Sequence, residues 1–175
     1  MRRKSLVALT TSFTLLVAIA APSANAATPQ ALKATVDGKV FESDDNGIIY
    51  LLPTKGVLNL IAITKGASAY PPPKTLNDQL SVICRSFDSK PAKYVAKDFG
   101  NHGCEATFKK GMSKVPFGNP EAEYDSRYGK NNTFEVTSVS GKVIEGKFHL
   151  EMKDKKPNSP LVIIDGTFKA EDRQK

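Results

Sequence analysis

Hydrophobic and polar side chains alternate most regularly over residues 133–170. The even positions of its central part carry Phe148, Leu150 and Met152, with polar residues between them. A period of two is typical of a β-strand with one buried face. A β-rich run at 133–139 precedes this part, with a turn at Gly141 between them, and alternation resumes at 161–170 after a charged loop. The pattern predicts three consecutive strands.

Shorter β-rich runs occupy the first part of the chain. Residues 31–43 indicate two strands, because Asp37-Gly38 favours the tight turn of a hairpin. Further runs follow at 48–52, 57–65 and 80–87. The whole pattern predicts an all-β fold, either an antiparallel β-sandwich or a partly closed β-barrel, with one short helix.

The short helix is expected where the alternation stops, between residues 111 and 132. Asn119 suits the N-cap of a helix and Pro120 its first position, while Gly129 suits its end. Glu121 and Glu123 are acidic, which favours the positive end of a helix dipole. These signals predict a helix that begins after Asn119 and ends at Gly129.

Three residues of this predicted helix are candidates for binding a protein partner. Tyr124 and Tyr128 are four residues apart, so a helix would place them on one face with Arg127 beside them. Aromatic and arginine side chains dominate the binding energy of protein interfaces. We therefore predict partner binding at Tyr124, Arg127 and Tyr128. The alternative is that both tyrosines pack the helix onto the sheet.

Residues 1–26 have the pattern of a cleaved signal peptide. Three basic residues at positions 2–4 precede an apolar run from Ser5 to Ala20, and Ala24-Asn25-Ala26 is a small-x-small cleavage site. The apolar run is shorter than the roughly 20 residues that a membrane-spanning helix needs. We expect cleavage after Ala26, a single all-β domain over 27–175, and a periplasmic or secreted protein without a stable membrane anchor.

The basic charge of the chain is moderate and evenly spread. The formal net charge is +7, and removal of the three basic residues of the signal peptide would lower it to +4. Basic residues that are not clustered favour solubility and weak attraction to anionic surfaces. We expect no nucleic-acid partner.

The chain has two cysteines, Cys84 and Cys104. An even pair in an exported protein predicts a disulfide, and both residues fall on the apolar face of an alternating run. A bond that closes a loop of this length stabilises a fold by about 3 kcal/mol in the chain-entropy account.

The segment 98–105 contains the residue types of a metal or hydrolytic site, namely Asp98, His102 and Glu105. An oxidised Cys104 cannot act as a thiolate ligand, and the spacing matches no known zinc pattern. Gly100 and Gly103 suit a tight turn before a strand. We favour a structural turn and expect no cofactor. No catalytic motif is recognised elsewhere, which favours a protein that is not an enzyme.

The segments KATVDGKVFES and VTSVSGKVIEGKFHLEMKDKKPNSPLVIIDGTFKAE, at 33–43 and 136–171, are similar to a group of small exported bacterial β-domains of unassigned function. The resemblance covers both terminal thirds and rests on strand and turn residues. It implies an antiparallel sandwich or a partly closed barrel, and it implies no catalytic residues. Many members carry a lipid-anchor cysteine, which this chain lacks.

These features favour a protein-binding module of the inhibitor, immunity or adaptor type. One alternative is a lipocalin-like carrier of a small apolar ligand, because antiparallel barrels of this size can enclose one. The other is a metal-dependent or hydrolytic protein that uses Asp98, His102 and Glu105.

Overall fold

The computed structural model of the chain describes residues 29–67, 71, 76–100, 102–112, 119–154, 156 and 158–174. The predicted signal peptide and its cleavage site lie outside the described residues. None of the helices in the described part is long and apolar enough to cross a membrane.

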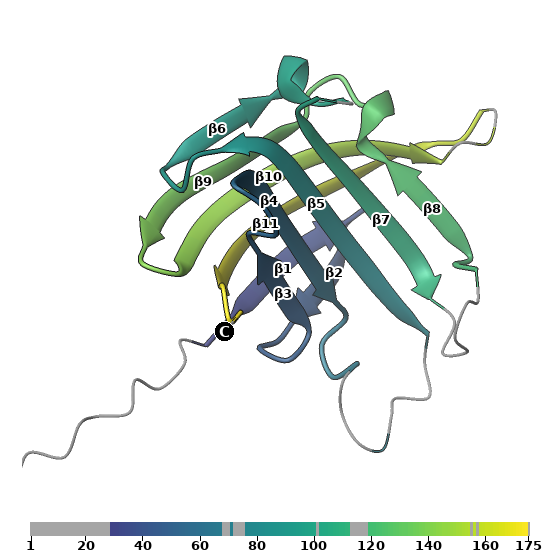
Figure 1. Cartoon of the computed structure of the whole chain (residues 1–175). Helices are drawn as coiled ribbons and strands as arrows, with labels where there is room; N and C mark the ends of the chain where they lie inside the picture. The colour runs from purple at the N-terminus through teal and green to yellow at the C-terminus, as the bar shows by residue number, and fades with distance from the viewer. Residues whose placement is uncertain are drawn as a thin grey trace, which may run out of the picture.

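Strands make up most of the described chain (Figure 1). In chain order they are β1 (Ala31–Val36), β2 (Lys39–Ser43), β3 (Ile48–Leu51), β4 (Gly56–Ile63), β5 (Asn77–Phe87), β6 (Ala92–Val95), β7 (Cys104–Met112), β8 (Ala122–Asp125), β9 (Thr133–Ser140), β10 (Val143–Asp154) and β11 (Leu161–Glu171). The helical segments are two 3-10 turns of three residues each, η1 (Ala96–Asp98) and η2 (Ser126–Tyr128).

The strands form one 11-stranded sheet that curls into a nearly closed barrel (Figure 1). Nine strands follow the order β2-β1-β11-β10-β8-β7-β5-β4-β3, while β9 pairs with β10 and β6 pairs with β9 beside this path. Every ladder between named strands is antiparallel. A parallel bridge from Tyr50 to Asp172 brings the β3 edge back to the end of β11. The prediction of an all-β fold with a partly closed barrel is confirmed.

Hydrogen bonds of Gln30 join β3 to the end of β11, where the barrel closes. Gln30 is buried, and its side-chain amide donates to the carbonyl of Ile48 at 3.2 Å and accepts from the amide of Glu171 at 2.9 Å. Its own backbone amide donates to Asp45, whose carboxylate also pairs with Arg173. The first described residues, the β2–β3 turn and the end of the chain are therefore joined at one place.

The predicted alternation is present in the strands. On β10 the even residues Ile144, Phe148, Leu150 and Met152 are buried, as the sequence pattern requires. Aromatic rings pack against one another in the interior of the barrel. Phe134 stacks on Phe168 with a centroid separation of 5.1 Å, and Phe41 meets Phe108 edge to face at 5.6 Å. Residues from all these strands thus form one continuous core.

The predicted helix after Asn119 is wrong for most of its length. Residues Ala122–Asp125 form strand β8, which pairs with β7 on one side and β10 on the other. Only Ser126–Tyr128 turn helically, as a single 3-10 turn. The capping signals are local, whereas unpaired edges on two neighbouring strands recruit this segment into the sheet, and tertiary pairing overrides weak helix propensity.

Candidate functional site

The predicted disulfide between Cys84 and Cys104 is confirmed. The two residues are direct partners in the β5–β7 ladder, with Cα atoms 4.0 Å apart. Both are fully buried. The bond joins the two ends of the segment 84–104, which contains the end of β5, strand β6 and η1.

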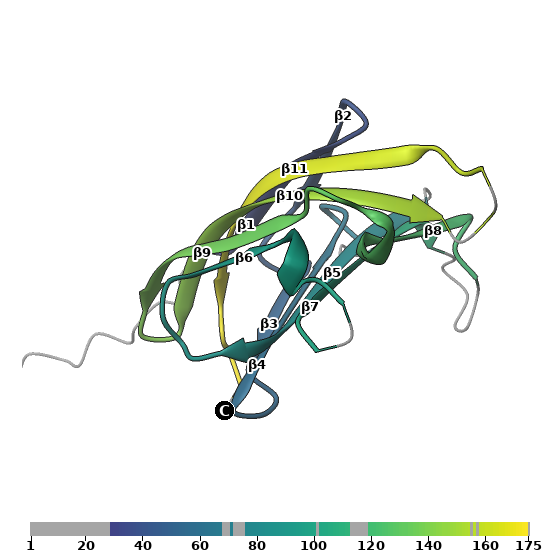
Figure 2. The same ribbon diagram turned by 90° about the horizontal axis from the view of Figure 1, so that it is seen from above.

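Within the segment 84–104, strands β5 and β6 diverge (Figure 2). After the turn at 88–91, β6 pairs with β9, and no ladder joins β6 to β5 among the described residues. The chain then passes through η1 and turns tightly back to Cys104, where the amide of Gly103 donates to the carbonyl of Gly100 at 3.1 Å. A side chain at Gly103 would collide with the carbonyl of Asp98, so this turn requires glycine there.

A pocket of about 450 Å³ occupies the space between the two diverging strands. This volume falls in the range of roughly 300–1,000 Å³ that is usual for small-molecule sites. Its described lining consists of Arg85, Ser86, Tyr94, Lys97, Asp98, Phe99, Gly100, His102 and Gly103. The lining therefore combines charged and polar side chains with apolar surface, and two of its residues, Arg85 and Gly103, are the chain neighbours of the disulfide cysteines.

The charged groups of this pocket differ in the hydrogen bonds and ion pairs that they form. Arg85 donates through Nη1 to Glu105 at 3.0 Å. One carboxylate oxygen of Asp98 accepts the amide of Val95 at 2.9 Å. Lys97 is exposed and forms no ion pair among the described residues. The lining thus contains two cations, Arg85 and Lys97, and one carboxylate, Asp98, of which one oxygen accepts a backbone amide.

Tyr94 contributes a buried hydroxyl to the same pocket. Its side chain is only 9% exposed, and its ring packs near Phe134 with centroids 6.5 Å apart. The hydroxyl oxygen has no hydrogen-bond partner among the described residues. Burial, followed by the carboxylates of Asp88 and Asp98, raises the pKa of Tyr94, so the phenol stays protonated and available as a donor.

The residues of the hypothetical metal or hydrolytic site have other contacts in this structure. Asp98 caps the β6–η1 junction and Glu105 pairs with Arg85, while His102 is exposed at the pocket rim. Within the described ranges no group of three or more histidine, cysteine, aspartate or glutamate residues is placed to hold a metal ion. The structure therefore gives that hypothesis no support.

The second 3-10 turn, η2, lies at the same end of the barrel as η1 (Figure 1). Hydrogen bonds with buried polar groups hold η2 in place. Asn132 donates to the carbonyl of Ser126 at 2.6 Å and accepts the amide of Glu151 at 2.7 Å. The hydroxyl of Ser126 accepts the amide of Ala106 at 2.9 Å. We call residues 96–100, 102, 103 and 126–132 together the η1–η2 end.

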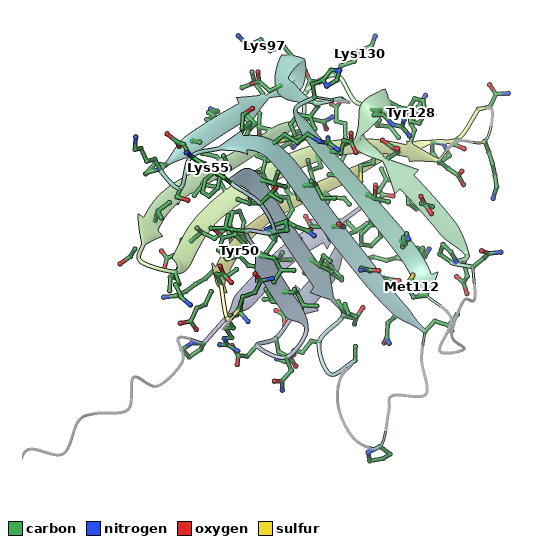
Figure 3. The ribbon with its side chains drawn as sticks, viewed as in Figure 1. Tyr50, Lys55, Lys97, Met112, Tyr128 and Lys130 are labelled. Carbon is green, nitrogen blue, oxygen red and sulfur yellow. A yellow bond between two sulfur atoms is a disulfide. The ribbon has the colours of Figure 1, made fainter. Side chains whose placement is uncertain are left out.

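The three residues predicted to bind a partner do not share one surface. Tyr128 is 48% exposed, and Arg127 beside it is exposed and fixed by Asp125, with Nη2 2.6 Å from a carboxylate oxygen. The hydrogen bond with Asp125 raises the pKa of Arg127 above its usual value. Tyr124 instead belongs to β8 and packs inside the barrel against Phe108. Figure 3 shows Tyr128 with Lys97 and Lys130 at one end of the barrel and Met112 at the other.

Tyr124 lines a second, more apolar pocket at the opposite end, which we call the β1–β2 end. Its described lining consists of Val36, Asp37, Lys39, Val40, Phe41, Asp78, Phe108, Lys110, Tyr124 and Val162. Its volume is about 110 Å³, below the usual range for ligand sites and below the 150 Å³ of an engineered cavity that binds benzene. The packed core gives the apolar-carrier hypothesis no support.

The sequence reasoning missed Arg85, Tyr94 and Lys97. Each comes from a different element, and the pairing of β6 with β9 positions Tyr94. The local pattern around Tyr94 indicates a buried position at most, because the missing hydrogen-bond partner of its hydroxyl depends on distant segments. No local signal marks this set.

Comparison of the chain with protein-family models, with curated proteins and with solved structures finds no match in any of the three. Any functional conclusion therefore depends on the residues and their geometry.

Proposed function

We propose that the chain is an exported protein-binding module, of the inhibitor, immunity or adaptor type, that recognises an acidic surface of its partner through the η2 turn. The exposed side chain of Tyr128 is the observation that carries this proposal. It projects from a turn that buried Ser126 and Asn132 fix by hydrogen bonds. An aromatic group presented rigidly loses little conformational entropy on binding.

The charges around Tyr128 favour an acidic partner. Arg127 and Lys130 flank it, and both are exposed. The nearby carboxylates already have partners, because Asp125 binds Arg127 and Glu151 accepts the amide of Lys130 at 2.9 Å. Lys130 forms no ion pair among the described residues, so an acidic surface would pair with it without displacing a structural contact. Such complementarity speeds association.

Residue type favours η2 over the other exposed apolar side chains. In the described part of the chain these are Val40, Ile49, Leu76, Leu161 and Ile163. Tyrosine and arginine are enriched among the residues that dominate binding energy, whereas leucine and valine are under-represented. Single exposed aliphatic residues on a monomer are also common and need no binding role. The proposal therefore places recognition on Arg127, Tyr128 and Lys130.

Export is supported by two features. The signal-peptide pattern at the N-terminus is one, and the buried disulfide, typical of oxidising compartments, is the other.

The test is partner capture with matched double variants. Tyr128→Ala with Lys130→Glu changes an exposed apolar side chain and a lysine at the η1–η2 end. Val40→Ala with Lys39→Glu makes the same kind of change at the β1–β2 end, where both residues are also exposed. Protein retained from the exported fraction is identified, and its affinity is measured for each variant.

We expect the first variant to weaken binding of the captured protein at least about 30-fold, which is the effect of losing a hot spot of about 2 kcal/mol. The control variant should bind as the wild type does. Equal loss in both variants, or loss only in the control, contradicts the assignment to η2.

A further inference from the structure

We propose that the pocket between β5 and β6 binds a small oxyanion-bearing ligand, with Tyr94 donating to a ligand oxygen while Arg85 and Lys97 supply positive charge. Carboxylates and phosphates share this chemistry. The proposal does not depend on the protein partner, because neither Tyr128 nor Lys130 lines this pocket.

The unpartnered hydroxyl of Tyr94 is the strongest indication of a ligand. Burying a hydroxyl without a hydrogen bond is unfavourable, and nearly all buried polar groups in native proteins have a partner. Tyr94 lines the pocket, and its phenol is protonated at neutral pH, because burial raises a pKa whose ordinary value is already 10. A protonated phenol pairs best with an acceptor oxygen. The missing partner therefore fits an oxygen atom of a bound molecule.

The positive groups at the pocket rim supply the charge that an anion requires. Arg85 uses Nη1 for Glu105, and a guanidinium carries five N–H groups, so donors remain for a second oxyanion. Lys97 is exposed on η1 and has no ion pair among the described residues. His102 adds a ring nitrogen. The lining also contains the carboxylate of Asp98, of which one oxygen accepts a hydrogen bond from the amide of Val95.

Backbone irregularities shape this pocket. Ser86 has φ of +68°, in the left-handed region that few residues other than glycine adopt. It is the unpaired residue of a β-bulge, since Arg85 and Phe87 pair with consecutive residues of β4. Bulges are common at barrel rims and beside active sites, where they redirect side chains. Here the bulge lies at the rim next to Arg85.

Calorimetric titration of the oxidised protein tests the proposal. Gluconate and inorganic phosphate are the anionic probes, and sorbitol is the neutral analogue of gluconate. Tyr94→Phe removes only the hydroxyl. Tyr50→Phe is the matched control, because Tyr50 is also buried and burial raises its pKa to about 12, yet it lies outside this pocket.

We expect the wild type and Tyr50→Phe to bind at least one anionic probe with equal affinity and not to bind sorbitol. Tyr94→Phe should bind that probe about tenfold more weakly, which corresponds to about 1.4 kcal/mol. Gluconate binding alone identifies an organic carboxylate, and phosphate binding alone identifies a phosphate group.

Three results overturn the proposal: no anionic probe binds the wild type, sorbitol binds as tightly as gluconate, or Tyr94→Phe binds like the wild type. Should Tyr94→Phe fail to fold, Lys97→Gln on the exposed rim decides instead. This variant should bind the anionic probe several-fold more weakly than the wild type at low salt, and an unchanged affinity overturns the proposal. None of these variants alters Tyr128 or Lys130, so failure here is separate from failure of partner capture.

Discussion

The two ends of this barrel are built from the same sheet but differ in their chemistry. At the η1–η2 end, strands β5 and β6 separate and leave a pocket of about 450 Å³ whose lining contains the charged residues Arg85, Lys97 and Asp98. At the β1–β2 end, Phe41, Phe108 and Tyr124 converge and leave about 110 Å³. One end has room for a ligand, and the other is nearly filled.

The difference has a structural cause. The β1–β2 end is lined by β7 and β8, which pair directly and bring Phe108 against Tyr124. At the η1–η2 end β6 pairs with β9 and not with β5, and the disulfide joins the two ends of the segment that contains β6. Packing thus stabilises one end, whereas a covalent bond and buried polar groups stabilise the other.

The largest expected effect comes from breaking the packed end. Phe108→Ala removes a fully buried ring between Phe41 and Tyr124 and should lower the free energy of unfolding by about 4 kcal/mol. Urea unfolding measures this change. Phe108→Leu, which keeps more of the volume, should cost about 1 kcal/mol. Partner and anion affinities of the folded Phe108→Leu variant should equal those of the wild type. A loss of either affinity would mean that the two ends are coupled.

A smaller effect is expected from breaking the covalent link. Replacing Cys84 and Cys104 by alanine should lower the free energy of unfolding by about 3 kcal/mol, because the bond closes a loop of 20 residues. Hydrogen exchange should accelerate most at the amides of Arg85 and Gly103, which take part in the turn beside the bond. Uniform acceleration over the whole barrel would contradict a local role of the disulfide at the η1–η2 end.

The smallest effect concerns the polar support of η2. Hydrogen bonds from the Asn131 side chain and then from the Lys130 amide lower the pKa of Glu151 below its ordinary value of 4.5. The ionised carboxylate therefore stabilises the fold above that value, and the contribution is lost as the pH falls through the lowered pKa. Glu151 is near the surface, so the effect should be at most about 0.5 kcal/mol.

Unfolding of the wild type and of Glu151→Gln, followed from neutral to acidic pH, measures this contribution. The wild type should be more stable at neutral pH, and the difference should shrink toward acidic pH. Parallel stability curves at every pH would contradict the proposed role of Glu151 under η2.

The sequence predicted what depends on local periodicity. Alternation in Val143–Asp154 identified the buried face of β10, and the positions of Cys84 and Cys104 on apolar faces identified the disulfide. These features follow from the period of a strand and from the pairing rule for exported cysteines. They need no knowledge of distant contacts.

The candidate sites could be predicted only in part, because they depend on pairing between distant segments. Asn119, Pro120 and Gly129 indicate a helix locally, yet Ala122–Asp125 fills an edge between β7 and β10. Tyr128 was found by residue type and by its spacing from Tyr124 on the predicted helix, and it is exposed, whereas Tyr124 faces the core. The pocket around Tyr94 exists because β6 pairs with β9 and not with β5, a choice that no local pattern encodes.

Cross-linking of the captured partner tests most directly whether recognition occurs at the η1–η2 end. A lysine-reactive cross-linker applied to the complex reports which lysines lie near the partner. We expect cross-links from Lys130 and Lys97, which lie together at this end (Figure 3). Cross-links confined to Lys39 and Lys110, which line the pocket of the β1–β2 end, would contradict the account.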